Sequence, residues 1–363
     1  MTHLFTLGWL TTSIMGALYQ FLPVALGRAI ASERVAHLSF ALHVPGVALF
    51  VTGVASGRET PLLVGITAVA TGIVLFLGNL GATLRRAQRR DVTWWAIAFA
   101  GAFLAVTLLF GVTLGLNLRS GFLGGARLVA LGTHLHVALF GWVLLVIVGV
   151  SQRLLPMFLL SHGGRTAPGR WAVGLLAAGA AVLALCHHLP VLGREVPAAL
   201  LGAGVVAYLA QAREYFRRRN RPVLDPGLRL AAAALVVLAA ALPLGAAVAA
   251  RAVGSRGETA YVATVVLACS LFVTAHYYKI VPFLIWNRYF GPLAGTRPLP
   301  RVADLYARPP ADLAVALLVA GAAALVAGIA AAVAPAVRAG GALFAGGVAI
   351  EAAQLTVTAR RRP

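Results

Sequence analysis

Long apolar stretches separated by short polar loops run through this chain from its first residues to its last. A membrane-spanning helix needs about 20 mostly apolar residues, and eleven stretches reach that length. They cover residues 4–27, 36–56, 61–84, 92–116, 128–160, 171–189, 196–216, 228–250, 259–285, 311–334 and 338–358. Charged residues make up only 11% of the chain and its mean hydropathy is +0.89, whereas a soluble domain carries about 25% charged residues. We therefore predict an all-α integral membrane protein that forms a single membrane domain over residues 1–363.

Three arginine-rich runs, which begin at Arg85, Arg217 and Arg360, set the expected orientation. Each run directly follows an apolar stretch, where the positive-inside rule places cytoplasmic arginine. The net charge of +20 is thus assigned to topology and to contact with anionic membrane lipid, not to nucleic acid. An odd number of spans then predicts an outside N-terminus and a cytoplasmic C-terminus in a bacterial-type inner (cell) membrane.

The two cysteines, Cys186 and Cys269, lie in apolar stretches and form no recognisable disulfide or zinc pattern. The first apolar stretch lacks a basic leading region and a small-residue cleavage site. We expect it to be a retained span and not a signal peptide.

The first and fifth apolar stretches share a motif built around Gly8-Trp9 and Gly141-Trp142. In both, a second glycine follows the first after eight residues and a proline follows after fifteen. His3 and His136 each precede the Gly-Trp pair by five residues, and the ninth stretch ends on a similar sequence, Tyr278 to Pro282. Four matching offsets and a shared histidine indicate an internal repeat.

The arginine runs follow the third, seventh and eleventh stretches, so the repeat has a period of four helices. We predict three similar units, at about residues 1–120, 121–252 and 253–363, all in the same orientation. Such parallel repeats differ from the inverted repeats of many transporters.

Ionisable residues inside a membrane are candidates for function, and apart from histidine the spans contain almost none but Lys279 and Glu351. Helix direction and the matched Gly-Trp pairs predict a layer of histidines near the outer edge of the membrane. Its members are His3, His134, His136, His187 and His188. Neutral imidazole is a common ligand of copper and haem iron. The alternative is a set of interfacial histidines that bind water or lipid headgroups.

Within this layer, His187 and His188 stand at the end of a helix and can reach one metal ion together. His134 and His136 differ by about 200° around their helix, so they would serve two different sites. A second, inner layer consists of His43 and His276, each roughly 10–12 Å from the inner helix end by helix rise. Those two are candidates for cofactor binding or, equally, polar residues satisfied inside the bundle.

The run from His134-Leu135-His136 to Leu155-Pro156-Met157-Phe158 resembles subunit I of the haem–copper oxidases and the related NnrS-like and oxidase-subunit-I-like membrane proteins. The resemblance implies three four-helix units in a pseudo-threefold arrangement. It also implies a haem-ligand role for His3 and copper-ligand roles for His136 or His134 and for the pair His187-His188.

The chain also departs from that family. Phe140 stands in the place of the family's tyrosine, and the ninth stretch has no histidine pair near its outer end. Buried glutamates and a path of carboxylates are likewise missing from the outer layer. The resemblance thus implies the fold and haem or copper binding, but it does not support oxygen reduction, and catalytic turnover stays an open question.

The leading hypothesis is a membrane protein that binds haem, copper or both through His136, His187 and His188, with His3 as a haem ligand. It would act in redox chemistry, nitric-oxide stress or metal handling, together with an electron-donor protein or other respiratory subunits. One alternative is a small-solute transporter or channel whose path is lined by His43, His276 and Lys279. Another is a non-catalytic assembly partner of a respiratory complex.

Overall fold

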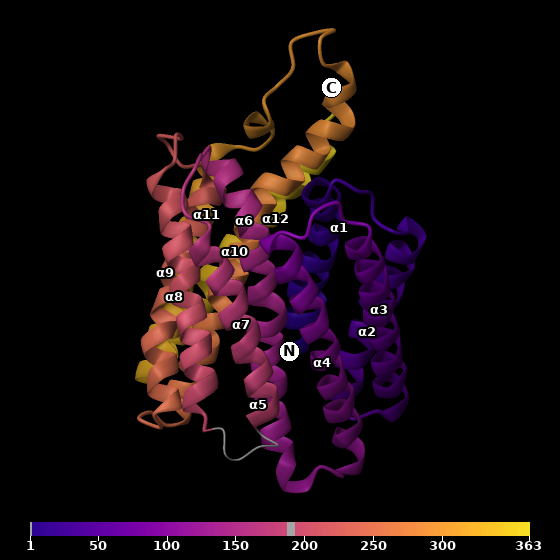
Figure 1. Ribbon diagram of the computed structural model, residues 1–363, viewed down its shortest axis with the longest axis vertical. Helices are drawn as coiled ribbons and strands as arrows, with labels where there is room; N and C mark the ends of the chain where they lie inside the picture. Colours follow the sequence, from indigo (N-terminus) through magenta and orange to yellow (C-terminus); the bar gives the residue numbers. More distant parts are fainter. Residues whose placement is uncertain (1, 187–192) are drawn as a thin grey trace. The chain divides into compact units, whose positions relative to one another are not determined.

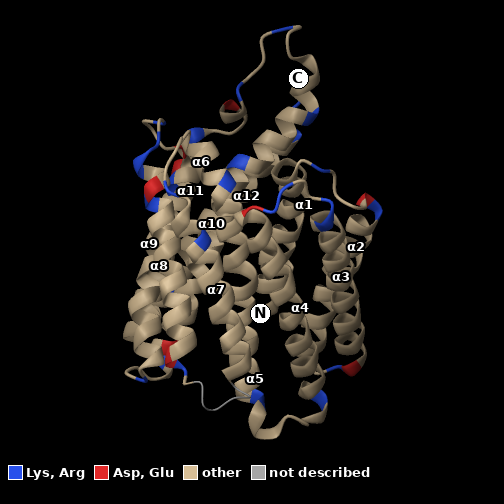
Figure 2. Ribbon diagram, viewed as in Figure 1, with Lys and Arg blue, Asp and Glu red and all other residues tan. Residues whose placement is uncertain are grey.

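The computed structural model describes residues 2–186 and 193–363, and within these ranges every regular element is helical. Eleven of the helical segments are long and apolar enough to cross a membrane (Figure 1). The predictions of an all-α chain and of eleven spans are confirmed at this level. Figure 2 shows that charged residues gather at the helix ends and in the loops, as a lipid environment requires.

The fifth and ninth spans are composite, and the others are single helices apart from a π-helical start to the first. In chain order the elements are η1 (Leu4–Thr11) and α1 (Thr12–Leu26); α2 (Glu33–Ser56); α3 (Glu59–Arg85); α4 (Val92–Ser120); η2 (Gly124–Ala126), α5 (Arg127–His136), η3 (Val137–Leu144) and α6 (Leu145–Leu159); α7 (Ala167–Cys186); α8 (Glu195–Arg217); α9 (Pro226–Ala249); α10 (Ser255–Ile285) with η4 (Trp286–Phe290) and η5 (Gly291–Leu293); η6 (Val302–Leu305); α11 (Arg308–Ala331); and α12 (Ala334–Arg360).

Contacts within the chain group these elements into two units. Unit 1 comprises Met1–Met157 and Ser161–Arg218, and unit 2 comprises Phe158–Leu160 and Arg219–Pro363. In unit 1 the helices α2 and α3 pack side by side, as do α7 and α8, while α4 lies against η3, α5 and α7. In unit 2 the close pairs are α9 with α10 and α11 with α12.

Three of these helix pairs, α2–α3, α7–α8 and α11–α12, are held by the same small-residue contact. Gly72, Gly204 and Gly347 occupy equivalent places on the second helix of each pair. A Cβ added to any of them would lie 2.7–3.1 Å from a side-chain carbon of the partner helix. Only glycine lets the two backbones come this close, which is the usual way helices associate in lipid.

An amide side chain seven residues after each of these glycines makes a second shared contact. Asn79, Gln211 and Gln354 each accept a hydrogen bond, at 2.9–3.0 Å, from a backbone N–H at the start of the neighbouring helix. The bond satisfies an N–H that has no partner within its own helix turn. Each amide stands six residues before the arginine that ends its helix. Local packing therefore repeats three times, while the pseudo-threefold arrangement of three units stays a prediction.

The first and fifth spans share a π-helical segment. The segment η1 begins directly after His3 and η3 directly after His136, and the glycines of the two Gly-Trp pairs are the fifth residue of each. A π-helix shifts backbone hydrogen bonding from i→i+4 to i→i+5, and such segments are frequent at functional sites. The sequence repeat noticed between these spans thus corresponds to a repeated backbone irregularity next to a histidine.

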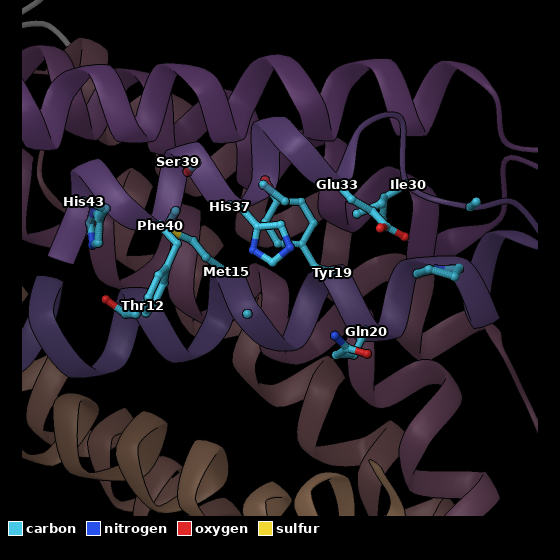
Figure 3. Close-up of a pocket in the computed structure, with 14 residues that line it drawn as sticks. Thr12, Met15, Tyr19, Gln20, Ile30, Glu33, His37, Ser39, Phe40 and His43 are labelled. Carbon is cyan, nitrogen blue, oxygen red and sulfur yellow. The ribbon is translucent and has the colours of Figure 1, made fainter. Parts of the chain in front are cut away.

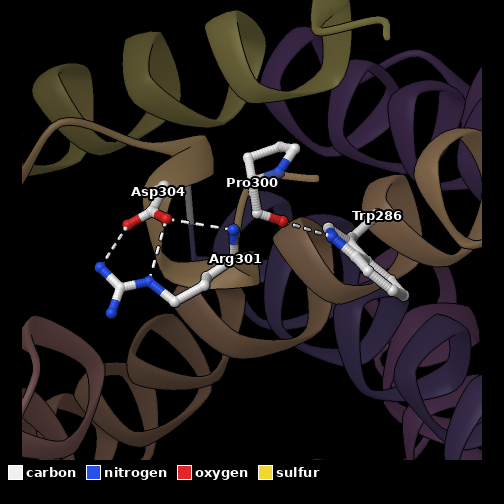
Figure 4. A network of polar contacts seen from close by, with 4 residues as sticks. All are labelled: Trp286, Pro300, Arg301 and Asp304. Carbon is white, nitrogen blue, oxygen red and sulfur yellow. Dashed lines mark hydrogen bonds and ion pairs between the residues drawn. The ribbon is translucent and has the colours of Figure 1, made fainter. Parts of the chain in front are cut away.

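The loop between α10 and α11 in unit 2 has an ordered turn (Figure 4). Trp286 Nε1 donates a hydrogen bond to the Pro300 carbonyl at 2.7 Å. Asp304 accepts from the backbone N–H of Arg301 at 3.0 Å and from its guanidinium at 3.1 and 3.2 Å. These hydrogen bonds from Arg301 hold the pKa of the Asp304 carboxyl below its ordinary value.

Candidate functional site

Two members of the predicted outer histidine layer lie side by side in unit 1. The imidazole ring centroids of His3, just before η1, and His134, in α5, are 6.2 Å apart. His134 Nδ1 lies 3.1 Å from the carbonyl oxygen of Thr107 in α4. Because a carbonyl only accepts, Nδ1 must carry the proton, so Nε2 offers a lone pair. That arrangement, with N–H bonded to a backbone carbonyl, is typical of metal-ligating histidines.

The surroundings hold both rings in place. The ring of Phe50, in α2, meets His3 edge-on at 5.2 Å between centroids. Gly111 in α4 lies so close to His134 that an added Cβ would be 3.2 Å from its Cε1. The hydroxyl of Thr107 is buried beside His134 and has no hydrogen-bond partner, an unusual state for a buried polar group.

The separation of the two rings suits coordination of one metal ion. With a metal–nitrogen bond of about 2.0–2.1 Å, each ring centroid lies roughly 3 Å from the ion, so two rings on one ion are roughly 5–6.5 Å apart. The observed 6.2 Å between the centroids of His3 and His134 falls in this range. Since Phe50 and Gly111 close on the rings from two sides, a single ion fits more readily than a large macrocycle.

The structure places His136 in different surroundings from His134. Its Nδ1 bonds the carbonyl of Gly132 in the same helix at 2.9 Å. Its ring stacks on Phe140 at 6.2 Å between centroids, with 9° between the planes. His134 and His136 thus contact different neighbours, and their assignment to two different sites stays a prediction.

The predicted copper pair, His187 and His188, lies outside the described residues. Within residues 2–186 and 193–363, no three His, Cys, Asp or Glu side chains come together as a set able to hold a metal ion. The pair His3–His134 thus needs at least one further ligand.

His43, the unit 1 member of the predicted inner layer, is completely buried in α2. Its Nε2 lies 3.2 Å from the carbonyl oxygen of Leu7 in η1, which also accepts from the Thr12 hydroxyl at 3.0 Å. The Nε2 atom must therefore donate, which leaves Nδ1 as a lone-pair acceptor. That atom is buried and has no hydrogen-bond partner among the residues that the structure describes. His43 contacts Gly72 of α3. The residue that contacts the equivalent glycine is Leu176 in the α7–α8 pair and Leu318 in the α11–α12 pair.

His43 also lines a groove of about 530 Å³ between α1 and α2 (Figure 3). The polar residues that line it are Thr12, Tyr19, Gln20, Glu33, His37, Ser39 and His43. Nothing lies within 4 Å of a Cβ added to Gly16, which borders the groove, whereas Gly149, its counterpart in the fifth span, meets Ala96 of α4 at 2.6 Å. The face of α1 that borders the groove is therefore open at Gly16. The corresponding face of the fifth span is covered by α4 at Gly149.

In unit 2, His276 and Lys279 both have partners. His276 Nδ1 lies 2.8 Å from the carbonyl oxygen of Phe272, and the two rings are 4.6 Å apart at their centroids. Lys279 forms an ion pair with Asp225 and lies 5.2 Å from the ring centroid of Phe158. His43 and His276 belong to different units, so each is interpreted by itself.

Sequence reasoning missed Phe50, Thr107 and Gly111, which surround the histidine pair. No short motif marks them, because they come from helices far away in the chain. It also missed the three amides at the helix ends, although a signal was present. The same offsets from a glycine and to a terminal arginine recur three times in the sequence.

None of the known protein-family models matches this chain, and no curated protein is significantly similar to it.

Proposed function

We propose that this protein is a multi-pass membrane protein that binds a redox-active metal at His3 and His134 in unit 1, in the first place a single copper ion, with haem iron as the alternative. The observation that supports the proposal is the pair of imidazoles 6.2 Å apart, one of them oriented by a backbone carbonyl. The resemblance to oxidase subunit I implies a haem-ligand role for His3 and a copper-ligand role for His136 or His134. When bound, copper or haem iron would supply one-electron chemistry.

The residues of this chain have distinct parts in that proposal. His134 presents Nε2 because the Thr107 carbonyl holds its other nitrogen, and Phe50 restricts the ring of His3. His136, His187 and His188 are the first candidates for further ligands, as the sequence suggests. Redox chemistry, nitric-oxide stress defence and metal handling are the functions that fit such a centre.

The test is an absorption spectrum and elemental analysis of protein purified through an affinity tag that contains no histidine. Wild-type protein should contain copper or iron near one ion per chain, with a Soret band if haem is bound. His3→Ala and His134→Ala should each lower the metal content severalfold. His162→Ala, which changes an exposed loop histidine, is the matched control and should leave it unchanged.

Two results would contradict the proposal: wild-type protein free of copper, iron and haem, or a metal content that survives the loss of both His3 and His134. Variants of His136, His187 and His188 then decide which additional side chains are ligands. If only substitutions of His136, His187 and His188 lower the metal content, the protein has a metal centre but His3 and His134 are not its ligands.

A second candidate function, binding or passage of a small solute, is favoured by the α1–α2 groove. Its volume of about 530 Å³ is in the range of small-molecule sites, roughly 300–1,000 Å³. His43 contributes a buried acceptor without a partner, where the other two helix pairs have leucine. A solute with a hydroxyl or N–H group would satisfy it.

His43→Leu separates the two functions, because it introduces the residue found at both equivalent positions. Under the metal proposal the variant should keep its metal. Under the solute proposal the His43→Leu variant should lose specific uptake of the solute or solute-dependent quenching of fluorescence. A protein without His3 and His134 should keep that uptake or quenching.

A further inference from the structure

Glu351 is an ionisable residue at a buried position of the repeated helix-end pattern that is aromatic in the other two helix pairs. Three residues before the shared amide stand Phe76 in α3, Tyr208 in α8 and Glu351 in α12. All three are buried, with 0%, 1% and 4% of their surface exposed. A site at which a local rule is broken, without a gain in packing, is a candidate for function.

No ion pair or hydrogen bond compensates the side chain of Glu351 among the described residues, and its Oε1 is buried. The hydrogen bond from Ala307 to Gln354 and the contact of Gly347 with α11 place Glu351 level with Ala311 and Ala314, which are both fully buried. An isolated carboxylate in such surroundings is costly, so the group takes up a proton.

Nearby cations are already engaged. Asp225 pairs with Lys279 and, at 3.5 Å, with Arg221. Asp312 pairs with Arg229 and, at 3.9 Å, with Arg308. Among the described residues of unit 2, the aspartates therefore hold these cations and Glu351 holds none.

Tyr278 in α10 is the expected neighbour of Glu351. Its hydroxyl is also buried without a partner, and α10 packs against α12. In unit 1 the equivalent residues, Tyr19 and Phe76, are in ring contact at 5.5 Å.

Tyr278 in turn leads to the loop at the inner end. Its ring centroid lies 5.3 Å from that of Tyr306, which follows η6. Burial, and then the negative charge of Asp225, raises the pKa of Tyr306 to about 12. Tyr306 is therefore a neutral phenol near pH 7, able both to donate and to accept a proton.

We propose that Glu351 is a proton-binding site of unit 2, which exchanges its proton with the inner aqueous phase through Tyr278 and Tyr306. The elements that pack against α12 near Glu351 carry these titratable or charged groups: Tyr278 and Lys279 on α10, Arg308 and Asp312 on α11, and Tyr306 in the loop before α11. Glu351 binds the proton as O–H. When that proton passes to the Tyr278 oxygen, the proton of the Tyr278 hydroxyl passes on toward Tyr306, so each tyrosine stays a neutral phenol. The site does not depend on metal binding in unit 1.

The experiment is labelling of the full-length protein in membranes with dicyclohexylcarbodiimide, which reacts with protonated carboxyl groups in apolar surroundings. At pH 7 an ordinary glutamate, with a pKa of about 4.3, is protonated in roughly one molecule in 500. Peptide mass spectrometry should therefore find Glu351 labelled more than about 100-fold more than Glu258, which is exposed at the other end of α10. Labelling should fall as the pH becomes alkaline.

Infrared difference spectra test the exchange route. Wild type minus Glu351→Gln should show the carbonyl band of a protonated carboxylic acid at pH 7, and Tyr278→Phe should keep that band but slow its shift in D₂O severalfold. Glu351→Tyr, which copies Tyr208, is the second variant if the glutamine form does not fold. Labelling of Glu351 no stronger than that of Glu258 would overturn the proton site, and unchanged exchange in Tyr278→Phe would overturn the route.

Discussion

Replacing Gly65 with alanine tests how tightly α2 and α3 are fitted together. Gly65 lies in the seam between these helices, where a Cβ would stand 2.6 Å from the Phe50 Cα and 2.9 Å from the Leu49 carbonyl carbon. Ordinary contact begins near 3.4 Å, and backbone atoms cannot swing aside. The two helices must therefore separate by roughly 1 Å, and overpacking of this kind costs about 1–3 kcal/mol.

Gly78→Ala is the matched control, because it lies on the same helix and has no atom within 4 Å of an added Cβ. Both variants gain the same intrinsic helix preference of alanine over glycine, about 1 kcal/mol, so this gain cancels in the comparison. One kcal/mol corresponds to about 2–4 °C in a unit of this size. Gly65→Ala should thus melt roughly 2–12 °C below Gly78→Ala.

The assay is thermal unfolding in detergent, followed by tryptophan fluorescence. Trp142 in unit 1 is 1% exposed, so its emission reports the loss of packing. The ring of Phe50 also touches His3, so Gly65→Ala should lose metal below its melting temperature. Equal melting temperatures for the two variants would refute the close contact between α2 and α3 at Gly65.

Further predictions concern the site, the loop and the orientation. Gly111→Ala adds a methyl group 3.2 Å from the Cε1 of His134 and should lower metal content while leaving the melting temperature nearly unchanged. The pKa of Asp304 is lowered by Arg301, so the turn they form is intact above the ordinary aspartate pKa of about 3.9. It should be lost as the pH falls through the lower folded value. The hydrogen-exchange protection of residues 291–307, corrected for the intrinsic exchange rate at each pH, should therefore be constant down to about pH 3.9 and fall below it. An Asp304→Asn protein should show no such fall. A cytoplasm-active reporter fused to the C-terminus should be active, and activity of a periplasmic reporter there would reverse the predicted topology.

Hydropathy predicted the spans well because a lipid environment leaves few alternatives to a helix. The largest differences are at the ends, where the fifth and ninth spans run over Gly124–Leu159 and Ser255–Leu293 instead of 128–160 and 259–285. These helices extend beyond their apolar stretches, because the backbone hydrogen bonds of a helix continue through the polar residues at its ends. The π-helical segments were not predictable, since their sequences are as apolar as those of the α-helices around them.

Counting residues along the helices placed His3 and His134 in one layer, and their rings are in fact close together. Depth follows from helix rise, so it can be counted from sequence. Which side chains face one another depends on helix rotation and tilt, which are set by distant contacts such as Gly111 against His134. That is why the sequence identified the histidines but neither the pairing of His3 with His134 nor the carbonyl that orients it.

The three helix pairs also indicate why particular polar residues matter. Each pair keeps the close glycine and the amide that caps the neighbouring helix, so the packing can be built without any other polar group. His43 replaces a leucine and Glu351 replaces an aromatic residue within that shared pattern. Both leave a buried atom without a hydrogen-bond partner, which costs stability that a leucine or phenylalanine would not. These two departures from the shared pattern are the reason for proposing that a solute at His43 and a proton at Glu351 complete the structure.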